Sequence, residues 1–254
     1  MSSYALFLFE GQKTEPNISR SLRKCVLDRD SMIIVESSFG FNIYKLFDAV
    51  AKDKFFDTYE YVVEQLQKKK VLTNEESTIL EFDDARKFEQ IYLFFDYDCH
   101  CTNAGDHKLE HMLELFNDSQ DKGLLCVSYP MVEAIRHQRR DEPEYLTYSI
   151  KELAEYKKWV NAAPEMDKQF VNWGTYTLDT WRSITKQHLA RANYLLRDSM
   201  EMPTEPLEVD VLFNCQLEKH ISNGEVVVIS GFPMMLLDHY GVSTYKKLEP
   251  ELGD

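Results

Sequence analysis

Carboxylates follow two strongly apolar runs in this sequence. Glu10 comes directly after Tyr4–Phe9, and the pair Asp96 and Asp98 follows Ile91–Phe95. Short, continuously apolar runs are typical of strands buried on both faces of a parallel sheet. We therefore expect all three acids at the carboxyl ends of their strands, which is the edge where open α/β sheets bind ligands.

Acids that converge at one sheet edge repel one another unless a proton or a cation lies between them. Ligation by oxygen alone suits Mg²⁺ or Mn²⁺. Glu10 is thus expected to act as a metal ligand or a general base, while Asp96 and Asp98 hold one or two ions that activate water and stabilise charge on a phosphate. The alternative is that the three acids are solvated strand ends. The chemistry indicated is metal-dependent phosphoryl transfer.

The elements that would position these acids can be predicted from the apolar pattern. Helical stretches separate the first four of the predicted strands, which gives right-handed βαβ connections and an α/β fold with a mainly parallel sheet flanked by helices. The five apolar runs that predict buried strands are Tyr4–Phe9, Met32–Val35, Ile91–Phe95, Leu124–Val127 and Val226–Ile229.

A helical insertion is expected after the fourth strand. From about Pro143 to Arg197 no buried strand is predicted, and apolar residues recur at helical spacing. A linker with two prolines, Met202–Pro206, follows it. We therefore predict an α/β core over residues 1–139, a helical lobe over 140–205 and a strand–helix unit over 206–254 that returns to the core.

The formal net charge of −14 does not favour a nucleic-acid substrate, because binding to the phosphate backbone is driven largely by Lys and Arg. Two local basic clusters, Lys68–Lys70 and Arg136–Arg140, provide candidate phosphate contacts, and Arg136 is taken as the substrate-binding candidate of the second. The alternative for both clusters is solvated surface. A basic partner protein would also match the acidic charge.

The composition favours a cytoplasmic protein. No run approaches the roughly 18 apolar residues of a membrane span, and Met1–Ser3 leads straight into the first apolar run without a basic segment. No membrane contact is expected. The five cysteines are odd in number and scattered, which predicts reduced thiols rather than disulfides.

Two short segments carry a family resemblance. Phe9–Pro16 resembles the Glu-Gly-x-Lys-Thr-Glu-Pro opening of the RloB-like TOPRIM proteins, which are related to nucleases of the overcoming-lysogenisation-defect type. Phe95–His100 resembles their Asp-x-Asp-x-His element, and Ser128–Ala134 their later Ser-x-Pro-x-x-Glu segment. The resemblance covers roughly residues 4–137 and implies a TOPRIM-like sheet that uses Mg²⁺ or Mn²⁺.

Further site residues come from the same segments. Lys13 is placed to neutralise a phosphate beside Glu10, or is a solvated lysine. Glu133 is expected to add a catalytic metal ligand, as the later Glu of the family does, or to be the first-turn acid of a helix. His100 is expected to contact phosphate or water beside Asp98. Glu15 is more simply a helix N-terminal acid, and Glu36, which also ends a strand, is a secondary candidate.

Two competing interpretations involve other residue types. Cys99, His100, Cys101, His107 and His111 include enough groups for a tetrahedral zinc site, although their spacing fits no strong zinc signature. The aromatic residues of the helical lobe could stack bases, or could simply pack in its core; they are Trp159, Trp173, Tyr176 and Trp181.

The leading functional hypothesis is a metal-dependent endonuclease that cleaves DNA or RNA, tRNA included, as the effector of a bacterial anti-phage defence system. The alternative is a regulated TOPRIM subunit that docks on a partner ATPase and is inactive until released. Members of the resembled family often form homo-oligomers or attach to a partner. No Gly-x-x-x-x-Gly-Lys-Ser/Thr loop for nucleoside triphosphates is present.

Overall fold

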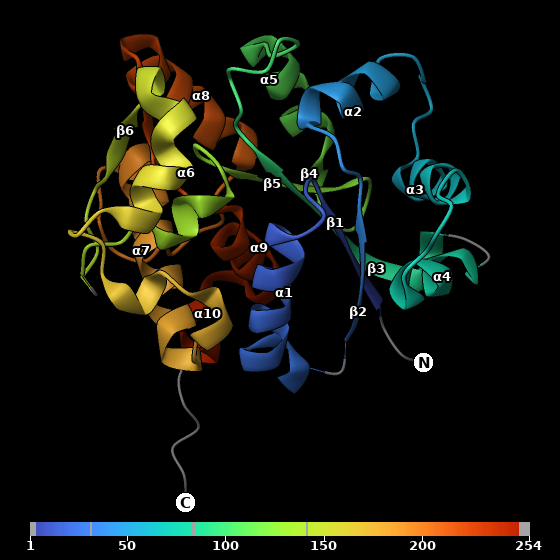
Figure 1. Cartoon of the computed structure of the whole chain (residues 1–254), viewed down its shortest axis with the longest axis horizontal. Coiled ribbons are helices and arrows are strands. Elements are labelled where there is room, and N and C mark those ends of the chain that lie inside the picture. Colours follow the sequence, from blue (N-terminus) through green and yellow to red (C-terminus); the bar gives the residue numbers. More distant parts are fainter. Residues whose placement is uncertain (1–3, 31, 83–84, 141, 249–254) are drawn as a thin grey trace, which may run out of the picture.

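The centre of the protein is a five-stranded sheet with the order β2-β1-β3-β5-β4 (Figure 1). The computed structural model describes residues 4–30, 32–82, 85–140 and 142–248. Residues 1–3 of the predicted core and 249–254 of the predicted C-terminal unit lie outside this part of the chain.

Four of the five strands are parallel. They are β1 (Tyr4–Phe9), β2 (Ile33–Ser38), β3 (Phe88–Asp96) and β5 (Gly123–Ser128). The two-residue β4 (Asn117–Asp118) adds an antiparallel edge to β5. The apolar runs of β1 and β5 are buried on both faces, as their sequences predict, so the protein has an α/β fold with a mostly parallel sheet.

Helices cover both faces of this sheet. On one face, Phe232 of α9 stacks on Phe94 of β3, with 4.6 Å between the ring centroids. On the other face, Phe95 of β3 stacks against Phe39 in the turn after β2. The described helices are α1 (Thr14–Cys25), α2 (Ile43–Val50), α3 (Thr58–Gln67), α4 (Asn74–Leu80), α5 (Asp106–Leu115), α6 (Leu153–Ala162), α7 (Leu178–Arg197), α8 (Val209–Lys219), α9 (Gly231–Tyr240) and α10 (Thr244–Lys247). None of them combines the length and apolarity needed to cross a bilayer.

The fifth predicted strand does not join the central sheet. β7 (Glu225–Val227) pairs instead with β6 (Thr147–Ser149) in a separate antiparallel ribbon. An isolated bridge between Ile229 and Tyr129 ties this segment to the end of β5. The apolar run was correctly predicted to be buried, because Val226–Ile229 is fully enclosed, but burial alone does not specify the pairing partner. β6 was missed because its three half-buried residues form no apolar run.

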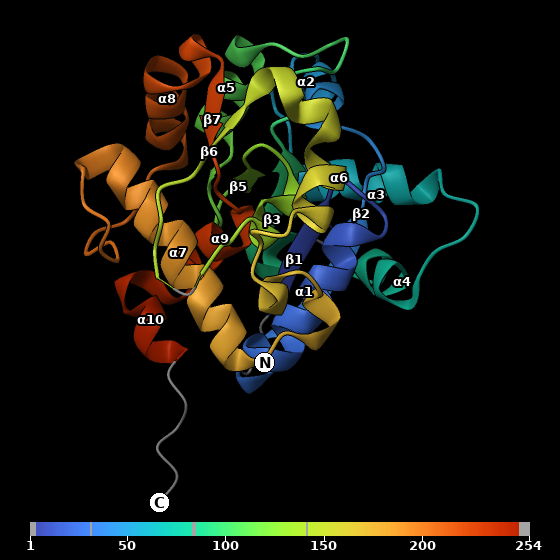
Figure 2. The same ribbon diagram turned by 60° about the vertical axis from the view of Figure 1, so that its left-hand side comes forward.

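The helical lobe is joined to the core through a buried arginine. Arg191 of α7 is fully buried and donates hydrogen bonds to the backbone carbonyls of Glu144 (2.6 Å) and Val228 (3.2 Å) and to Gln138 Oε1 (2.5 Å). Its contacts thus unite the lobe with the segments that follow β5 and β7. Burial lowers the pKa of Arg191 to about 9. Figure 2 shows α7 running beside α8 and α9, so the lobe and the C-terminal unit share one core with the sheet.

The start of α9 approaches β5 closely at Gly231. The Gly231 N–H donates to Ser128 Oγ (3.1 Å), and a Cβ at Gly231 would lie 2.4 Å from the carbonyl oxygen of Cys126. Since that oxygen belongs to a strand in the middle of the fold, the contact cannot be relieved by turning a side chain.

We predict that Gly231→Ala lowers the free energy of unfolding by about 1–3 kcal/mol, the usual cost of overpacking a core. Urea unfolding measures this change. Gly174→Ala is the control, because the added Cβ meets only the side chain of Asn172, at 3.3 Å. Equal stability of the two variants would contradict the close contact.

Candidate carboxylate site at the end of the sheet

Glu10 and Asp96 lie side by side where β1 and β3 end. The backbone N–H of Asp96 donates to Glu10 Oε2 at 3.2 Å, and the N–H of Glu10 donates to the carbonyl of Phe94 at 3.0 Å. The parallel register, in which Phe9 is paired with Phe94, produces this arrangement. The structure therefore brings these two predicted site residues together.

A third acid, Glu15, joins them from the start of α1. Its side chain is buried and accepts a hydrogen bond from the N–H of Gly11 at 2.9 Å. The turn from Glu10 to α1 is thus closed by Glu15. Glu15 is therefore more than the helix N-terminal acid that the sequence predicts; its place in the Glu-Gly-x-Lys-Thr-Glu motif was the signal that it belongs to the site.

The acids raise one another's pKa values. Burial raises the pKa of Glu10 to about 7; the hydrogen bond from Asp96 opposes this shift, and the charges of Glu15 and Asp98 add to it. Burial, followed by the charges of Glu10, Glu15 and Glu133, raises the pKa of Asp96 well above its ordinary value. Burial also raises the pKa of Glu15. The site therefore holds more negative charge than its surroundings stabilise.

Asp98 faces the loop that follows β3. Its Oδ1 accepts from the N–H of His100 (3.2 Å), and its Oδ2 accepts from the thiol of Cys101 (2.9 Å). Cys101 in turn receives a hydrogen bond from Asn42, the cap of α2, at 3.0 Å. The exposed ring of His100 points to the carbonyl of Ile150 at 2.8 Å. Asp98 thus borders the site, while His100 bonds to the helical lobe.

Glu133 is fully buried beside the other acids. It follows β5, in the 3-10 helix Val132–Arg136, and its Oε1 lies 2.6 Å from the ammonium of Lys157 on α6. Its charge contributes to the raised pKa of Asp96. Glu133 is therefore not an exposed first-turn acid. Lys157 was missed in the sequence, where nothing distinguishes it from the neighbouring Lys158 of the same helix.

The two predicted cationic residues differ in their surroundings. Lys13 is exposed at the cap of α1, three residues from Glu10, and has no ion pair within the described part of the chain. Arg136 lies flat on Trp173, with its guanidinium carbon 3.4 Å from the ring centroid, and bonds to Asn161. Lys13 is available to a phosphate, whereas Arg136 already holds two parts of the helical lobe together.

The donor chemistry of the site fits a hard divalent cation. The charges of Glu10 and Glu133 both raise the pKa of Asp96, and a cation bound there would relieve this repulsion. Within the described residues no three His, Cys, Asp or Glu side chains converge on one point as ligands. Mg²⁺ usually keeps several waters and binds through one or two carboxylates, so the Glu10–Asp96 pair meets its ordinary requirement.

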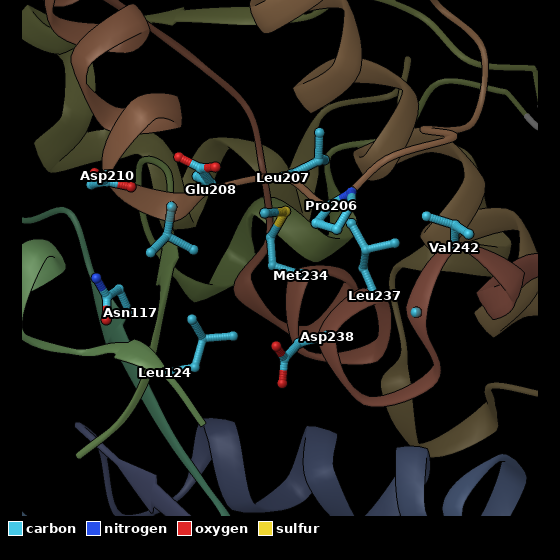
Figure 3. A pocket seen from close by; sticks show the side chains of 12 residues that line it. Asn117, Leu124, Pro206, Leu207, Glu208, Asp210, Met234, Leu237, Asp238 and Val242 are labelled. Carbon is cyan, nitrogen blue, oxygen red and sulfur yellow. The ribbon is translucent and has the colours of Figure 1, made fainter. Parts of the chain in front are cut away.

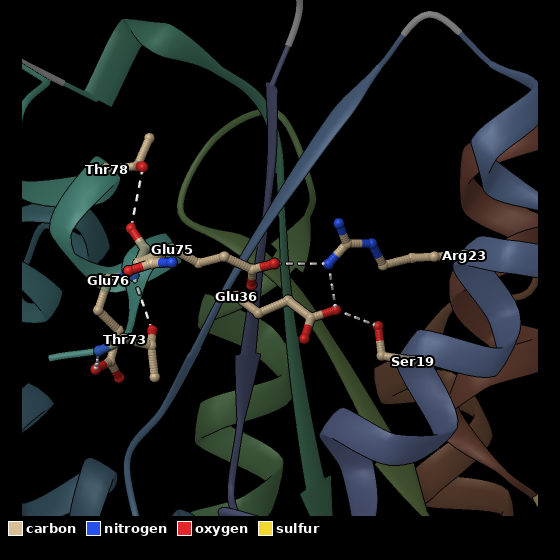
Figure 4. Close-up of polar contacts among 8 residues, drawn as sticks. Ser19, Arg23, Glu36, Thr73, Glu75, Glu76 and Thr78 are labelled. Atoms are coloured by element: carbon tan, nitrogen blue, oxygen red, sulfur yellow. Dashed lines mark hydrogen bonds and ion pairs between the residues drawn. The ribbon is translucent and has the colours of Figure 1, made fainter. Parts of the chain in front are cut away.

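Glu36 takes a different position from the one considered in the sequence. It lies opposite Phe7 in the middle of the β1–β2 pairing and faces α1. Its Oε1 accepts from Ser19 (2.5 Å) and from Arg23 (3.2 Å), and Arg23 also bonds to Glu75 (Figure 4). Glu36 is thus bound in an ion-pair network between α1, β2 and α4.

The residues of the alternative zinc site are dispersed. The thiol of Cys101 bonds to Asp98, His100 points to Ile150, and His111 packs edge-on against Phe47 of α2 at 5.7 Å. Burial, followed for Cys101 by the hydrogen bond to Asp98, raises the pKa of both Cys99 and Cys101 to about 11, which keeps them as thiols. All five cysteines are free, as predicted.

The aromatic residues of the helical lobe divide between its core and partial exposure. Trp181 and Tyr176 are buried, whereas Trp159 and Trp173 are half-buried. Trp159 contacts the ring of His137 at 4.9 Å, and Trp173 is covered by Arg136. These contacts support the core-packing interpretation.

A sizeable pocket lies away from the carboxylates. It has an apolar floor that includes Leu124 and Met234, and an acidic rim of Glu208, Asp210 and Asp238 (Figure 3). Leu124 lies near the start of β5, at the end opposite to Ser128, the partner of Asp96. The pocket therefore contains none of the predicted site residues.

Comparison with protein-family models, curated proteins and solved structures found no match to this chain. Its function is therefore inferred from its residues and their geometry.

The raised pKa of Glu10 predicts a pH-dependent stability. The folded protein keeps the Glu10 proton between the ordinary pKa of 4.5 and about 7, where the unfolded chain has lost it. Without divalent metal, the free energy of unfolding should therefore fall as the pH rises through this window, by at most about 3 kcal/mol for this group.

Urea unfolding in EDTA, at about pH 5 and about pH 8, measures this fall. Glu10→Gln should show a smaller fall than the wild type, because the amide does not ionise. Glu155→Gln on the exposed surface of α6 serves as the control. An equal pH dependence in all three proteins would contradict the raised pKa.

Proposed function

We propose that this protein is a TOPRIM-like, Mg²⁺- or Mn²⁺-dependent endonuclease. The observation that carries the proposal is the contact of Glu10 with Asp96 at the carboxyl ends of adjacent parallel strands, in surroundings that make both carboxylates hard to ionise. Clustered, pKa-shifted acids at the ligand-binding edge of a sheet are a typical signature of a functional site.

The residues of the site fit distinct roles in phosphodiester hydrolysis. Glu10, with a pKa near neutrality, is suited to accept a proton from the attacking water. Asp96 would hold the ion, with Asp98 and Glu133 beside it. A bound Mg²⁺ or Mn²⁺ would supply charge stabilisation at the phosphate and a more acidic water. Lys13 is free to neutralise a phosphate oxygen.

The proposed substrate is DNA or RNA, tRNA included. This choice and the role in anti-phage defence depend on the RloB-like motifs of Phe9–Pro16 and Phe95–His100. A cytoplasmic location would suit such an effector.

A second candidate is a regulated subunit that docks on a partner ATPase and becomes active on release. The net charge of −14 favours it, because a strongly acidic surface repels a nucleic acid unless a basic partner is present. Such a subunit would not cut alone but would form a stable complex with its partner.

Cleavage of plasmid DNA and of total cellular RNA by the purified protein with Mn²⁺ or Mg²⁺ tests the proposal. We expect Glu10→Gln and Asp96→Asn to lose at least about 100-fold in cleavage rate, since an amide neither accepts a proton from water nor binds a cation as a carboxylate does. The two substitutions keep the size of the side chain.

Glu36→Gln is the matched control, because this acid lies on the adjacent strand but bonds to Ser19 and Arg23. It should keep its activity. Cleavage by both Glu10→Gln and Asp96→Asn at the wild-type rate would contradict the proposal. Absence of cleavage by the wild type, together with a stable complex with an ATPase, would favour the regulated subunit.

A further inference from the structure

A basic and aromatic hollow lies beside the carboxylate site. It has a volume of about 250 Å³ and is formed by the turn after β2, the start of α2 and one side of α3. Phe39, Phe41 and Tyr61 supply its aromatic surface, while Lys45 and Lys68 supply positive charge. Lys68 belongs to the Lys68–Lys70 cluster, which the sequence predicts as a candidate phosphate contact.

The aromatic rings continue from the hollow to the end of β3. Phe41 stacks on Phe39 with 5.1 Å between centroids and 24° between planes, and Phe39 stacks on Phe95 at 6.0 Å. Phe95 directly precedes Asp96. Phe39 and Phe41 are only half-buried, so part of their surface remains open to a ligand.

The backbone of this turn is fixed to the candidate site. The N–H of Gly40 donates to the carbonyl of Glu10, and the N–H of Phe39 donates to the carbonyl of Phe9, both at 2.9 Å. Gly40 adopts a φ of +72°, a conformation that favours glycine and lets the turn close against Glu10. The hollow and the carboxylates therefore belong to one continuous edge of the sheet.

The lysines of the hollow differ in how far they are already neutralised. Lys69 is held by Glu76 at 2.6 Å and by the carbonyl of Ser38, and Lys68 faces Glu64 at 3.9 Å. Lys45 is exposed, its ammonium lies 5.1 Å from the centre of the Phe41 ring, and no acid of the described residues pairs with it. A partly exposed aromatic ring next to an ammonium that no described acid neutralises suits a base and the phosphate attached to it.

We propose that this hollow binds an unpaired nucleotide of a single-stranded nucleic acid, with the base on Phe41 and its phosphate on Lys45. The inference depends on the proposed function for the identity of the substrate. It adds that the substrate is single-stranded beside the cleaved bond, because a base within a duplex does not offer its face to a side chain.

Binding of fluorescent oligonucleotides measured by anisotropy in EDTA tests this inference without cleavage. The probes are a single-stranded DNA, the RNA of the same sequence, the DNA duplex and a DNA strand with abasic sites. We expect both single strands to bind more tightly than the duplex and the abasic strand, and the stronger of the two to identify the sugar preference.

Two substitutions separate stacking from charge. Phe41→Leu keeps an apolar side chain but removes the ring, and should raise the Kd for the single strand about tenfold while leaving the abasic strand unaffected. Phe41→Trp should restore the affinity. Lys45→Ala should reduce the slope of log K against log salt concentration by about 0.7, the value for one lost phosphate contact in a single strand.

A matched pair of controls lies outside the hollow, beyond the far end of α2. The ammonium of Lys54 lies 5.9 Å from the centre of the Phe55 ring, and Phe55 is 85% exposed, so the same pairing occurs there without lining the hollow. Phe55→Leu and Lys54→Ala should bind as the wild type does. Thermal melts of all variants establish that they fold.

The inference would be overturned if Phe41→Leu and Phe55→Leu bound the single strand with equal affinity. It would also be overturned if the wild-type protein bound the abasic strand as tightly as the intact strand. If the wild type cuts nucleic acid in that case, the nuclease proposal would stand without the proposed binding hollow. Binding that depends on Phe41 and Lys45, in a protein that does not cut with any divalent metal, would support the hollow and contradict the nuclease proposal.

Discussion

The repulsion between carboxylates at the ends of β1 and β3 is the constraint on which the functional part of the structure depends. Parallel pairing of the apolar runs of β1 and β3 brings Glu10 and Asp96 out together, and burial disfavours the charged form of both. The charges of Glu15 and Glu133 add to the repulsion. Such an arrangement destabilises the folded protein unless a proton or a cation is bound. Local destabilisation of this kind is characteristic of functional sites.

The rest of the fold holds these acids in place from several directions. Glu15 closes the turn before α1, Lys157 reaches Glu133 from α6, and the thiol of Cys101 fixes Asp98. The helical lobe is itself fixed by Arg191, whose bonds reach the segments after β5 and β7. The lobe therefore contributes to the site through Lys157, although the sequence predicted the site within the α/β core alone.

The sequence predicted the features that depend on local pattern. The four parallel strands and the acids at their ends follow from short apolar runs, because burial on both faces leaves a simple signal. It could not predict features that depend on tertiary pairing: the run Val226–Ile229 is as apolar as a central strand, yet its strand β7 pairs with β6, and Glu36 follows an apolar run yet bonds to Arg23. The burial of Glu15 and Glu133 likewise depends on neighbours far along the chain.

The measurement that tests the central claim most directly is a ¹³C NMR titration of the carboxyl groups of Glu10 and Asp96, with and without Mg²⁺. The account predicts that Glu10 titrates near pH 7 in the metal-free protein, and that saturating Mg²⁺ lowers the pKa values of both residues because the cation favours their ionised forms. Titration of Glu10 near its ordinary pKa of 4.5, unchanged by Mg²⁺, would contradict the account.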